Sequence, residues 1–127
     1  MYRSFNCVII DDEPNAISSL RNCLLELHAP IDISGAYSNW NLAVKNLKEE
    51  GCDILFLDIS LPGINGIDLL KQLPNLAAEV IFVTGHPEYA LKAFQYAPTG
   101  YLMKPIVLAE LEKVVDKAIE RASYKRP

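Results

Sequence analysis

The sequence predicts an α/β fold, a single doubly wound sheet of five parallel strands with helices on both faces. Five short apolar runs recur along its 127 residues, and each is followed by a stretch with helical spacing of apolar residues. The third run contains Ile54-Leu55-Phe56-Leu57, four large apolar residues in succession, which is typical of a strand buried on both faces. Because strand–helix–strand connections are right-handed, we expect the strand order 2-1-3-4-5.

The individual elements follow from spacing and from turn residues. We expect the strands at residues 7–10, 31–37, 53–57, 80–83 and 100–103. The five stretches after them carry apolar residues three or four apart, as one face of a helix does. In chain order these residues are Ile17, Leu20, Leu24, Leu27; Trp40, Ala43, Val44, Leu47; Ile67, Leu70, Leu73; Ala90, Ala93, Phe94, Ala97; and Leu108, Leu111, Val115, Ala118. Pro14 suits the first turn of the first helix and Gly51 the end of the second, whereas Pro74 and Pro98 end the third and fourth.

Length and composition indicate one ordinary globular domain. Half of the residues are hydrophobic and 22% are charged, and 127 residues are enough for one core. The formal net charge of −4 gives this segment no basic surface for direct contact with nucleic acid. We assign residues 1–121 to the domain and residues 122–127, which are polar and basic, to a frayed tail or the start of a linker.

Cysteine content and hydropathy bear on the cellular compartment. The three cysteines, Cys7, Cys23 and Cys52, have no Cys-x-x-Cys spacing, so we expect reduced thiols rather than a disulfide or a metal site. No apolar run approaches the roughly 18 residues that cross a membrane, and the apolar run at residues 7–10 is too short for a signal peptide. We therefore expect a soluble cytoplasmic domain without a membrane partner.

Polar residues lie at the C-terminal ends of four of the predicted strands. Asp11, Asp12 and Glu13 follow the first strand, Asp58 follows the third, Thr84 ends the fourth and Lys104 follows the fifth. In this fold these strand ends meet at one edge of the sheet, which is where ligands bind. Two carboxylates about 4 Å apart repel by about 4 kcal/mol at an effective dielectric of about 20, so we expect a cation among them.

The chemistry of these groups favours magnesium and a phosphoryl group. Hard oxygen ligands without histidine or cysteine select Mg²⁺, which retains waters and binds phosphate oxygens. Lys104 adds a second positive charge and Thr84 a hydroxyl donor, and a carboxylate is able to act as the nucleophile that forms an acyl phosphate. Each residue alone has an ordinary explanation, as a helix cap or a turn residue. Their joint placement at four strand ends carries the interpretation.

The motifs that hold these residues resemble a known family over nearly the whole chain. They are the acidic pair Asp11-Asp12, the stretch DISLPGING at residues 58–66, Thr84, and Lys104-Pro105. The resemblance is to the receiver domains of bacterial two-component response regulators, which have a flavodoxin-like fold. It implies that Asp58 accepts phosphate from a sensor histidine kinase and that Lys104 pairs with the phosphate.

The resemblance also assigns the remaining roles. It implies that Asp12 binds Mg²⁺ directly, Asp11 binds it through water, and Asp58 and the Ser60 carbonyl complete the site. Thr84 and Tyr101 would form the conformational switch. The protein would then be a signalling phospho-acceptor rather than an enzyme with a separate substrate. We further expect Gly85 to leave room for the phosphoryl donor and His86 to influence how long the phosphate lasts.

Three further stretches narrow the resemblance to receivers attached to LytTR-type DNA-binding domains. They are DDEPNA at residues 11–16, HPEYA at 86–90 and YLMKP at 101–105. Gly100 departs from that subfamily, which usually has Asp before the tyrosine. A LytTR domain would need further residues beyond Pro127, so we expect an excised or a stand-alone receiver. Tyr89, Lys92 and Tyr96 lie off the apolar stripe of the fourth helix, and we expect a phosphorylation-dependent homodimer through the fourth helix, fifth strand and fifth helix.

Two other classes share parts of this pattern. A flavodoxin-like electron carrier would need a loop rich in Ser, Thr or Gly after the first strand, but this chain has acids there, which repel a flavin phosphate. A phosphatase of the haloacid-dehalogenase type also uses an aspartate nucleophile with Mg²⁺. Its two aspartates after the first strand are two residues apart, whereas Asp11 and Asp12 are adjacent.

Overall fold

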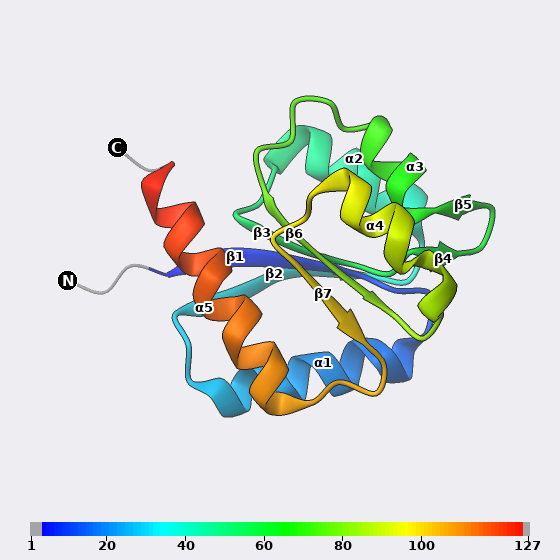
Figure 1. Cartoon of the computed structure of the whole chain (residues 1–127). Helices are drawn as coiled ribbons and strands as arrows, with labels where there is room; N and C mark the ends of the chain where they lie inside the picture. The colour runs from blue at the N-terminus through cyan, green and yellow to red at the C-terminus, as the bar shows by residue number, and fades with distance from the viewer. Residues whose placement is uncertain (1–3, 126–127) are drawn as a thin grey trace.

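The fold has five parallel strands in one sheet, covered by helices on both faces (Figure 1). The computed structural model describes residues 4–125. The sheet has the order β2-β1-β3-β6-β7, which confirms the predicted order, because the predicted fourth and fifth strands are β6 and β7. Its strands are β1 (Phe5–Ile10), β2 (Ile31–Tyr37), β3 (Ile54–Leu57), β6 (Glu79–Thr84) and β7 (Gly100–Met103).

Five α-helices and two short strands complete the fold. The helices are α1 (Pro14–Leu27), α2 (Trp40–Glu50), α3 (Gly66–Lys71), α4 (Ala90–Tyr96) and α5 (Leu108–Tyr124), and a 3₁₀ turn, η1 (Pro87–Tyr89), precedes α4. Pro14 opens α1 and Gly51, at φ 66°, ends α2, as predicted. The strands β4 (Ser60–Leu61) and β5 (Ile64–Asn65) form an antiparallel hairpin between β3 and α3 that the sequence analysis did not predict.

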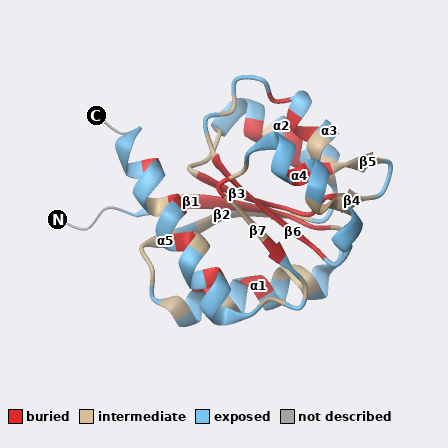
Figure 2. Ribbon diagram, in the orientation of Figure 1, coloured by how far each residue is buried: buried red, intermediate tan, exposed pale blue. Residues whose placement is uncertain are grey.

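The hydrophobic core lies on both faces of the sheet. Helices α1 and α5 cover one face, and α2, α3 and α4 cover the other (Figure 1). The central strands β3 and β6 are buried along their whole length, whereas the helices are exposed on their outer sides (Figure 2). Among residues 4–125, no helix is both long and apolar enough to cross a membrane. All three cysteines are free, and burial raises the pKa of both the Cys7 and the Cys52 thiol to about 12.

Several expected details were wrong. Phe94 was expected in the buried stripe of α4, but it is 67% exposed, because α4 packs through Ala93 and Phe94 instead stacks on Tyr101 of β7. Leu108 is likewise exposed at the start of α5. The frayed tail was expected to begin at residue 122, but α5 continues to Tyr124 and Ala122 is buried. Residues 126 and 127 of that tail lie outside the described residues.

Position 100, the first residue of β7, is a glycine because no side chain fits there. A Cβ atom at this position would lie 2.7 Å from Cγ1 of Val114 on α5, closer than real Cβ contacts allow. The strand and the helix therefore approach each other more closely than an aspartate would permit. This packing explains the departure of Gly100 from the pattern noted in the sequence.

A buried carboxylate joins the start of β6 to the end of α5. Glu79 is 3% exposed and accepts hydrogen bonds from Thr99 Oγ1 at 2.6 Å and from Arg121 Nε at 2.7 Å. Its second oxygen pairs with the ammonium of Lys125, which also donates to the Ala77 carbonyl at 2.6 Å. Burial favours the protonated acid, but the hydrogen bonds from Lys125, Thr99 and Arg121 outweigh it, and the pKa of Glu79 lies below its usual value.

We predict that Glu79→Gln lowers the free energy of unfolding at pH 7 by about 1–2 kcal/mol, because it removes a charge-assisted set of hydrogen bonds. The folded-state pKa of Glu79 is depressed, so its stabilisation is complete above the pKa of the unfolded chain and is lost as pH falls through the folded pKa. Urea unfolding at pH 7 and at about pH 3 measures both effects. The difference between wild type and variant should shrink at the lower pH, whereas Glu120→Gln, at an exposed glutamate of α5, should change little at either.

Candidate functional site

The candidate site is built around Asp58 at the end of β3. Its backbone N–H donates to the Ile10 carbonyl at 3.0 Å, which continues the pairing of β3 with β1 by one residue. The side chain is held by the Ser60 N–H, which donates to Oδ1 at 3.0 Å. Asp58 is only 4% exposed, but it lines a cavity of about 300 Å³ beside Lys104 and Pro105. The carboxylate is therefore oriented by the backbone and lies next to open space.

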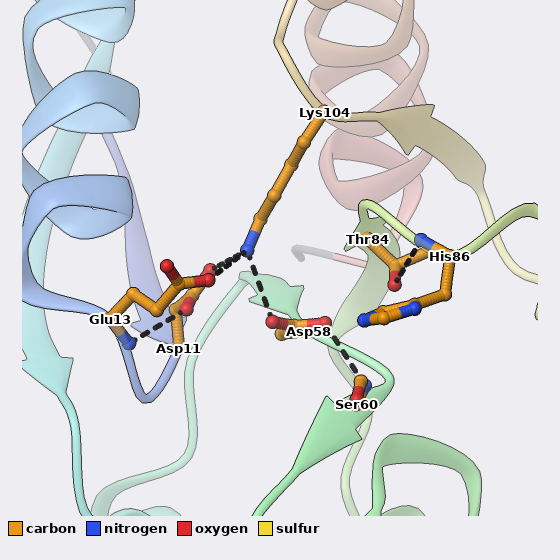
Figure 3. Close-up of polar contacts among 7 residues, drawn as sticks. All are labelled: Asp11, Glu13, Asp58, Ser60, Thr84, His86 and Lys104. Carbon is orange, nitrogen blue, oxygen red and sulfur yellow. Dashed lines mark hydrogen bonds and ion pairs between the residues drawn. The ribbon is translucent and has the colours of Figure 1, made fainter.

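Lys104 bridges the carboxylates of two strands (Figure 3). Its Nζ lies 2.7 Å from Asp11 Oδ2 and 3.1 Å from Asp58 Oδ2, and Glu13 Oε1 is 3.7 Å away. The lysine is positioned because its backbone N–H donates to the Thr84 carbonyl at 2.9 Å, directly after β7. The Lys104–Pro105 peptide bond is cis. One ammonium group thus faces three carboxylates.

Burial and charge act in opposite directions at this bridge. Burial raises the pKa of Asp58, and the neighbouring Asp11 charge adds to this, although the Ser60 N–H and Lys104 favour the ionised form. Burial lowers the pKa of Lys104, but its bonds to Asp11 and Asp58 outweigh burial, so that this pKa lies above the usual value. Lys104 is therefore a fixed positive charge at a site that has an excess of acidic groups.

The acids after β1 form a group of hard oxygen donors. One carboxylate oxygen each from Asp11, Asp12 and Glu13 lies within 4.8 Å of the others. The Glu13 N–H donates to Asp11 Oδ1 at 3.0 Å, which fixes one member of the group. These oxygens suit Mg²⁺, which prefers carboxylates. Asp58 is not in this group, and Glu13, which the sequence analysis did not assign to the metal, is. The run of three acids was the signal for it.

Thr84 and the two residues after it lie on the other side of Asp58. Thr84 is fully buried, and its Oγ1 accepts a hydrogen bond from the His86 N–H at 3.2 Å. The imidazole of His86 points toward Asp58 (Figure 3), and its Nδ1 lies 3.1 Å from Glu88 Oε1. A Cβ at Gly85 would lie 3.9 Å from Cβ of Lys104, so this position is open rather than crowded. Within residues 4–125, no hydrogen bond joins Thr84 to Asp58.

Tyr101 meets the same segment from β7. Its hydroxyl lies 3.5 Å from the His86 carbonyl, a long and weak contact, and its ring stacks on Phe94 with centroids 6.1 Å apart. Burial, with the nearby Glu88 charge, raises the pKa of the Tyr101 hydroxyl. The backbone of His86 therefore contacts Thr84 through its N–H and Tyr101 through its carbonyl. Sequence reasoning missed this link, because backbone groups carry no residue-specific signal.

Solved structures share this fold. The signal receiver domain of a modulated diguanylate cyclase from Desulfovibrio desulfuricans superimposes with a TM-score of 0.81 at 26% identity, covering 98% of this chain and 100% of that one. The receiver domain of the response regulator AraT from Geobacillus stearothermophilus gives a TM-score of 0.82, also at 26% identity and with the same coverage.

Curated relatives match at the level of sequence. An uncharacterized response regulatory protein of Vibrio vulnificus is 36% identical over 118 residues, covering 92% of this chain and 48% of the relative. The transcriptional regulatory protein BtsR of Escherichia coli is 38% identical over 117 residues, covering 91% of this chain and 48% of the relative. The chain thus spans about half the length of these relatives.

A family description fits most of the chain. The sequence model of the response regulator receiver domain matches residues 7–116, which include every residue of the candidate site. The buried aspartate, the acidic group and the bridging lysine lie within this match. The chain therefore belongs to the response regulator receiver domains, which act in two-component signalling.

Proposed function

We propose that Asp58 accepts a phosphoryl group from the phosphohistidine of a sensor histidine kinase. The observation that carries this proposal is the orientation of its carboxylate, with Oδ1 held by the Ser60 N–H and Oδ2 directed at Lys104. An Asp58 oxygen attacks phosphorus, the P–N bond to the kinase histidine breaks, and the imidazole leaves with the bonding electron pair. The product is an acyl phosphate on Asp58, and Lys104 pairs with its oxygens.

The acidic group fits a role for Mg²⁺ in this transfer. Asp11, Asp12, Asp58 and the Ser60 carbonyl would hold the ion, with Asp12 binding directly and Asp11 through water. Bound Mg²⁺ supplies positive charge that offsets the negative charge of the phosphoryl oxygens. In the structure Asp11 is engaged by Lys104 and by the Glu13 N–H, whereas Asp12 is partly exposed, which supports this division of roles.

We propose further that the switch controls transcription through a LytTR-type DNA-binding domain. The support is that the relative BtsR is a transcriptional regulatory protein, together with the motifs DDEPNA, HPEYA and YLMKP of this sequence. The curated relatives are about twice as long as this chain, which leaves room for such a domain in them. The family membership decides against the flavodoxin-like carrier and the phosphatase.

We predict that incubation with acetyl phosphate and Mg²⁺ adds one labile phosphate, detected by intact mass spectrometry, and that Asp58→Asn abolishes it. The variant keeps the size of the side chain but removes the nucleophile. Chelation of Mg²⁺ should reduce labelling of the wild type by about 100-fold or more, since charge neutralisation contributes several kcal/mol. Asp116→Asn, at an exposed position of α5, is the matched control. Full labelling of Asp58→Asn would refute the assignment.

His86 is proposed to influence the lifetime of the phosphate, and Gly85 to leave room for the phosphoryl donor. The His86 ring points toward Asp58 and Gly85 adds no side chain there, so the imidazole would be placed to shield an acyl phosphate from water. We predict that His86→Ala speeds loss of phosphate, measured after removal of acetyl phosphate, without preventing labelling. Glu88→Gln, which removes the negative charge beside the imidazole but keeps His86, serves as the control for changes in η1. An unchanged rate in His86→Ala would reduce this residue to a bystander.

The face of α4, β7 and α5 is proposed to form a homodimer when Asp58 is phosphorylated. Several large apolar side chains are exposed there: Leu91, Phe94, Tyr96, Met103, Val107 and Leu108. Such a patch is more than solvation requires, and apolar and aromatic groups are typical of interface centres. Tyr96 also contacts Phe82 of the core, at 5.8 Å between ring centroids, so Leu91 is the cleaner position to test.

We predict that beryllofluoride with Mg²⁺ shifts the wild type from monomer toward dimer in analytical ultracentrifugation. Leu91, which is 73% exposed, should lose most of its exposed apolar area in the dimer, so Leu91→Ala should weaken dimerisation about tenfold. Leu25→Ala on α1, where the leucine is 67% exposed, is the matched control and should leave dimerisation unchanged. Equal dimerisation of both variants would exclude this face.

A further inference from the structure

The hairpin that carries Ser60 is poorly supported by its own geometry. It has only two residue pairs, Ser60 with Asn65 and Leu61 with Ile64. Pro62 and Gly63 form its two-residue loop, and Gly63 has φ +84°, the pattern of a type II turn. Type II turns splay the strands of a two-residue hairpin, because their twist does not match that of the strands. Such a hairpin needs a stabilising contact from another element of the fold.

Trp40 supplies a contact from another element. Its indole Nε1–H donates to the Pro62 carbonyl at 2.8 Å, from the first residue of α2 to the tip of the hairpin. Trp40 is itself held, because the Asn39 side chain caps α2 by accepting from the Asn41 N–H at 2.9 Å. The partly buried ring also packs against the core beneath α2, α3 and α4. Figure 1 shows the hairpin projecting beyond the sheet.

The accepting carbonyl is the one that defines the turn. Type I and type II turns differ by rotation of the peptide between their second and third residues, here Pro62 and Gly63. The bond from Trp40 fixes the direction of that peptide. From this point the chain runs through Leu61 to Ser60, whose N–H holds Asp58 Oδ1 at 3.0 Å. The other end of the hairpin is anchored by the Gly66 N–H, which donates to the Ile59 carbonyl at 2.7 Å.

We propose that Trp40 is a positioning residue of the Asp58 site, which sets the β4–β5 hairpin so that Ser60 meets both Asp58 and the cation. The inference rests on the proposed function for its consequence, but its first step, the hold on the hairpin, does not. Trp40 acts on Asp58 only through the hairpin, which it contacts at the Pro62 carbonyl. The motif of residues 58–66 does not predict this role, because Trp40 lies 18 positions before Asp58, on α2.

Trp40→Phe separates the hydrogen bond from packing, since it keeps an aromatic ring and removes the donor. The direct measurement is amide hydrogen exchange of residues 60, 61 and 63–65 in the metal-free protein, followed by NMR. We expect exchange in the hairpin to rise about two- to tenfold, as for loss of one hydrogen bond, with β1 and β3 unchanged. Tyr37→Phe, at a partly buried aromatic against the same core, is the control. Unchanged hairpin exchange in Trp40→Phe would overturn the inference.

The consequence for the site is measured by calorimetric titration with Mg²⁺ alone and by the acetyl phosphate dependence of labelling. Trp40→Phe should weaken Mg²⁺ binding about two- to tenfold, whereas Tyr37→Phe should leave it unchanged. Gly63→Ala disfavours the φ of +84° without a clash and should reproduce this loss. The double variant should lose no more than the larger single loss, because both changes act on one turn. Additive losses would overturn the inference, whereas a wild type that neither binds Mg²⁺ nor gains phosphate would overturn the proposed function instead.

Discussion

The bridge from Lys104 to Asp11 and Asp58 is the interaction on which the site depends. Asp11 and Asp58 are each 4% exposed, and without a cation between them their repulsion would oppose folding of this edge. Lys104 follows β7, and β6 lies between β7 and β3, so Lys104 and Asp58 start two strand spacings of about 4.8 Å apart, with β1 one spacing further away. The long side chain of Lys104 reaches across the end of β6, and the side chains of Asp58 and Asp11 extend toward it.

Buried carboxylates at the two opposite ends of the strands differ in how far their charge is compensated. At the edge where β6 starts, the single carboxylate of Glu79 has three partners, Thr99, Arg121 and Lys125, so its charge is fully compensated. At the edge where β3 ends, three carboxylates share one ammonium group. The first arrangement fastens a helix to the sheet and has no capacity for another ligand. The second keeps an excess of negative charge, which is the arrangement expected of a site that binds a cation.

The positions of the main site residues could be predicted from the sequence, because they depend only on where the strands end. Strand order places Asp11, Asp58, Thr84 and Lys104 at one edge once the five apolar runs are recognised, and no side-chain detail is needed. The hairpin after Asp58 could not be predicted, because two-residue strands are shorter than any periodicity that reveals them. The exposure of Phe94 was missed for a different reason: a helix of seven residues packs through one alanine, and its spacing alone does not say which face that is. The partners of Glu79 are 20 to 46 residues away in sequence, and no local pattern connects them.

The backbone of His86 offers a physical route for the proposed switch. Its N–H holds the Thr84 hydroxyl oxygen, and its carbonyl faces the Tyr101 hydroxyl, so a shift of Thr84 toward a phosphoryl group acts on a segment that also contacts β7. The contact to Tyr101, at 3.5 Å, is weak enough to be exchanged at small cost. Tyr101 in turn stacks on Phe94, which is part of the exposed apolar face of α4, β7 and α5. Full reversal of a two-state equilibrium from about 1:99 to 99:1 needs about 5.5 kcal/mol of differential binding. Under the proposed function, a phosphoryl group held by Lys104, a cation and Thr84 would differ in charge from the free carboxylate, and burial of the exposed face in a dimer would add to that difference, so these are the two contributions that would have to supply the ~5.5 kcal/mol.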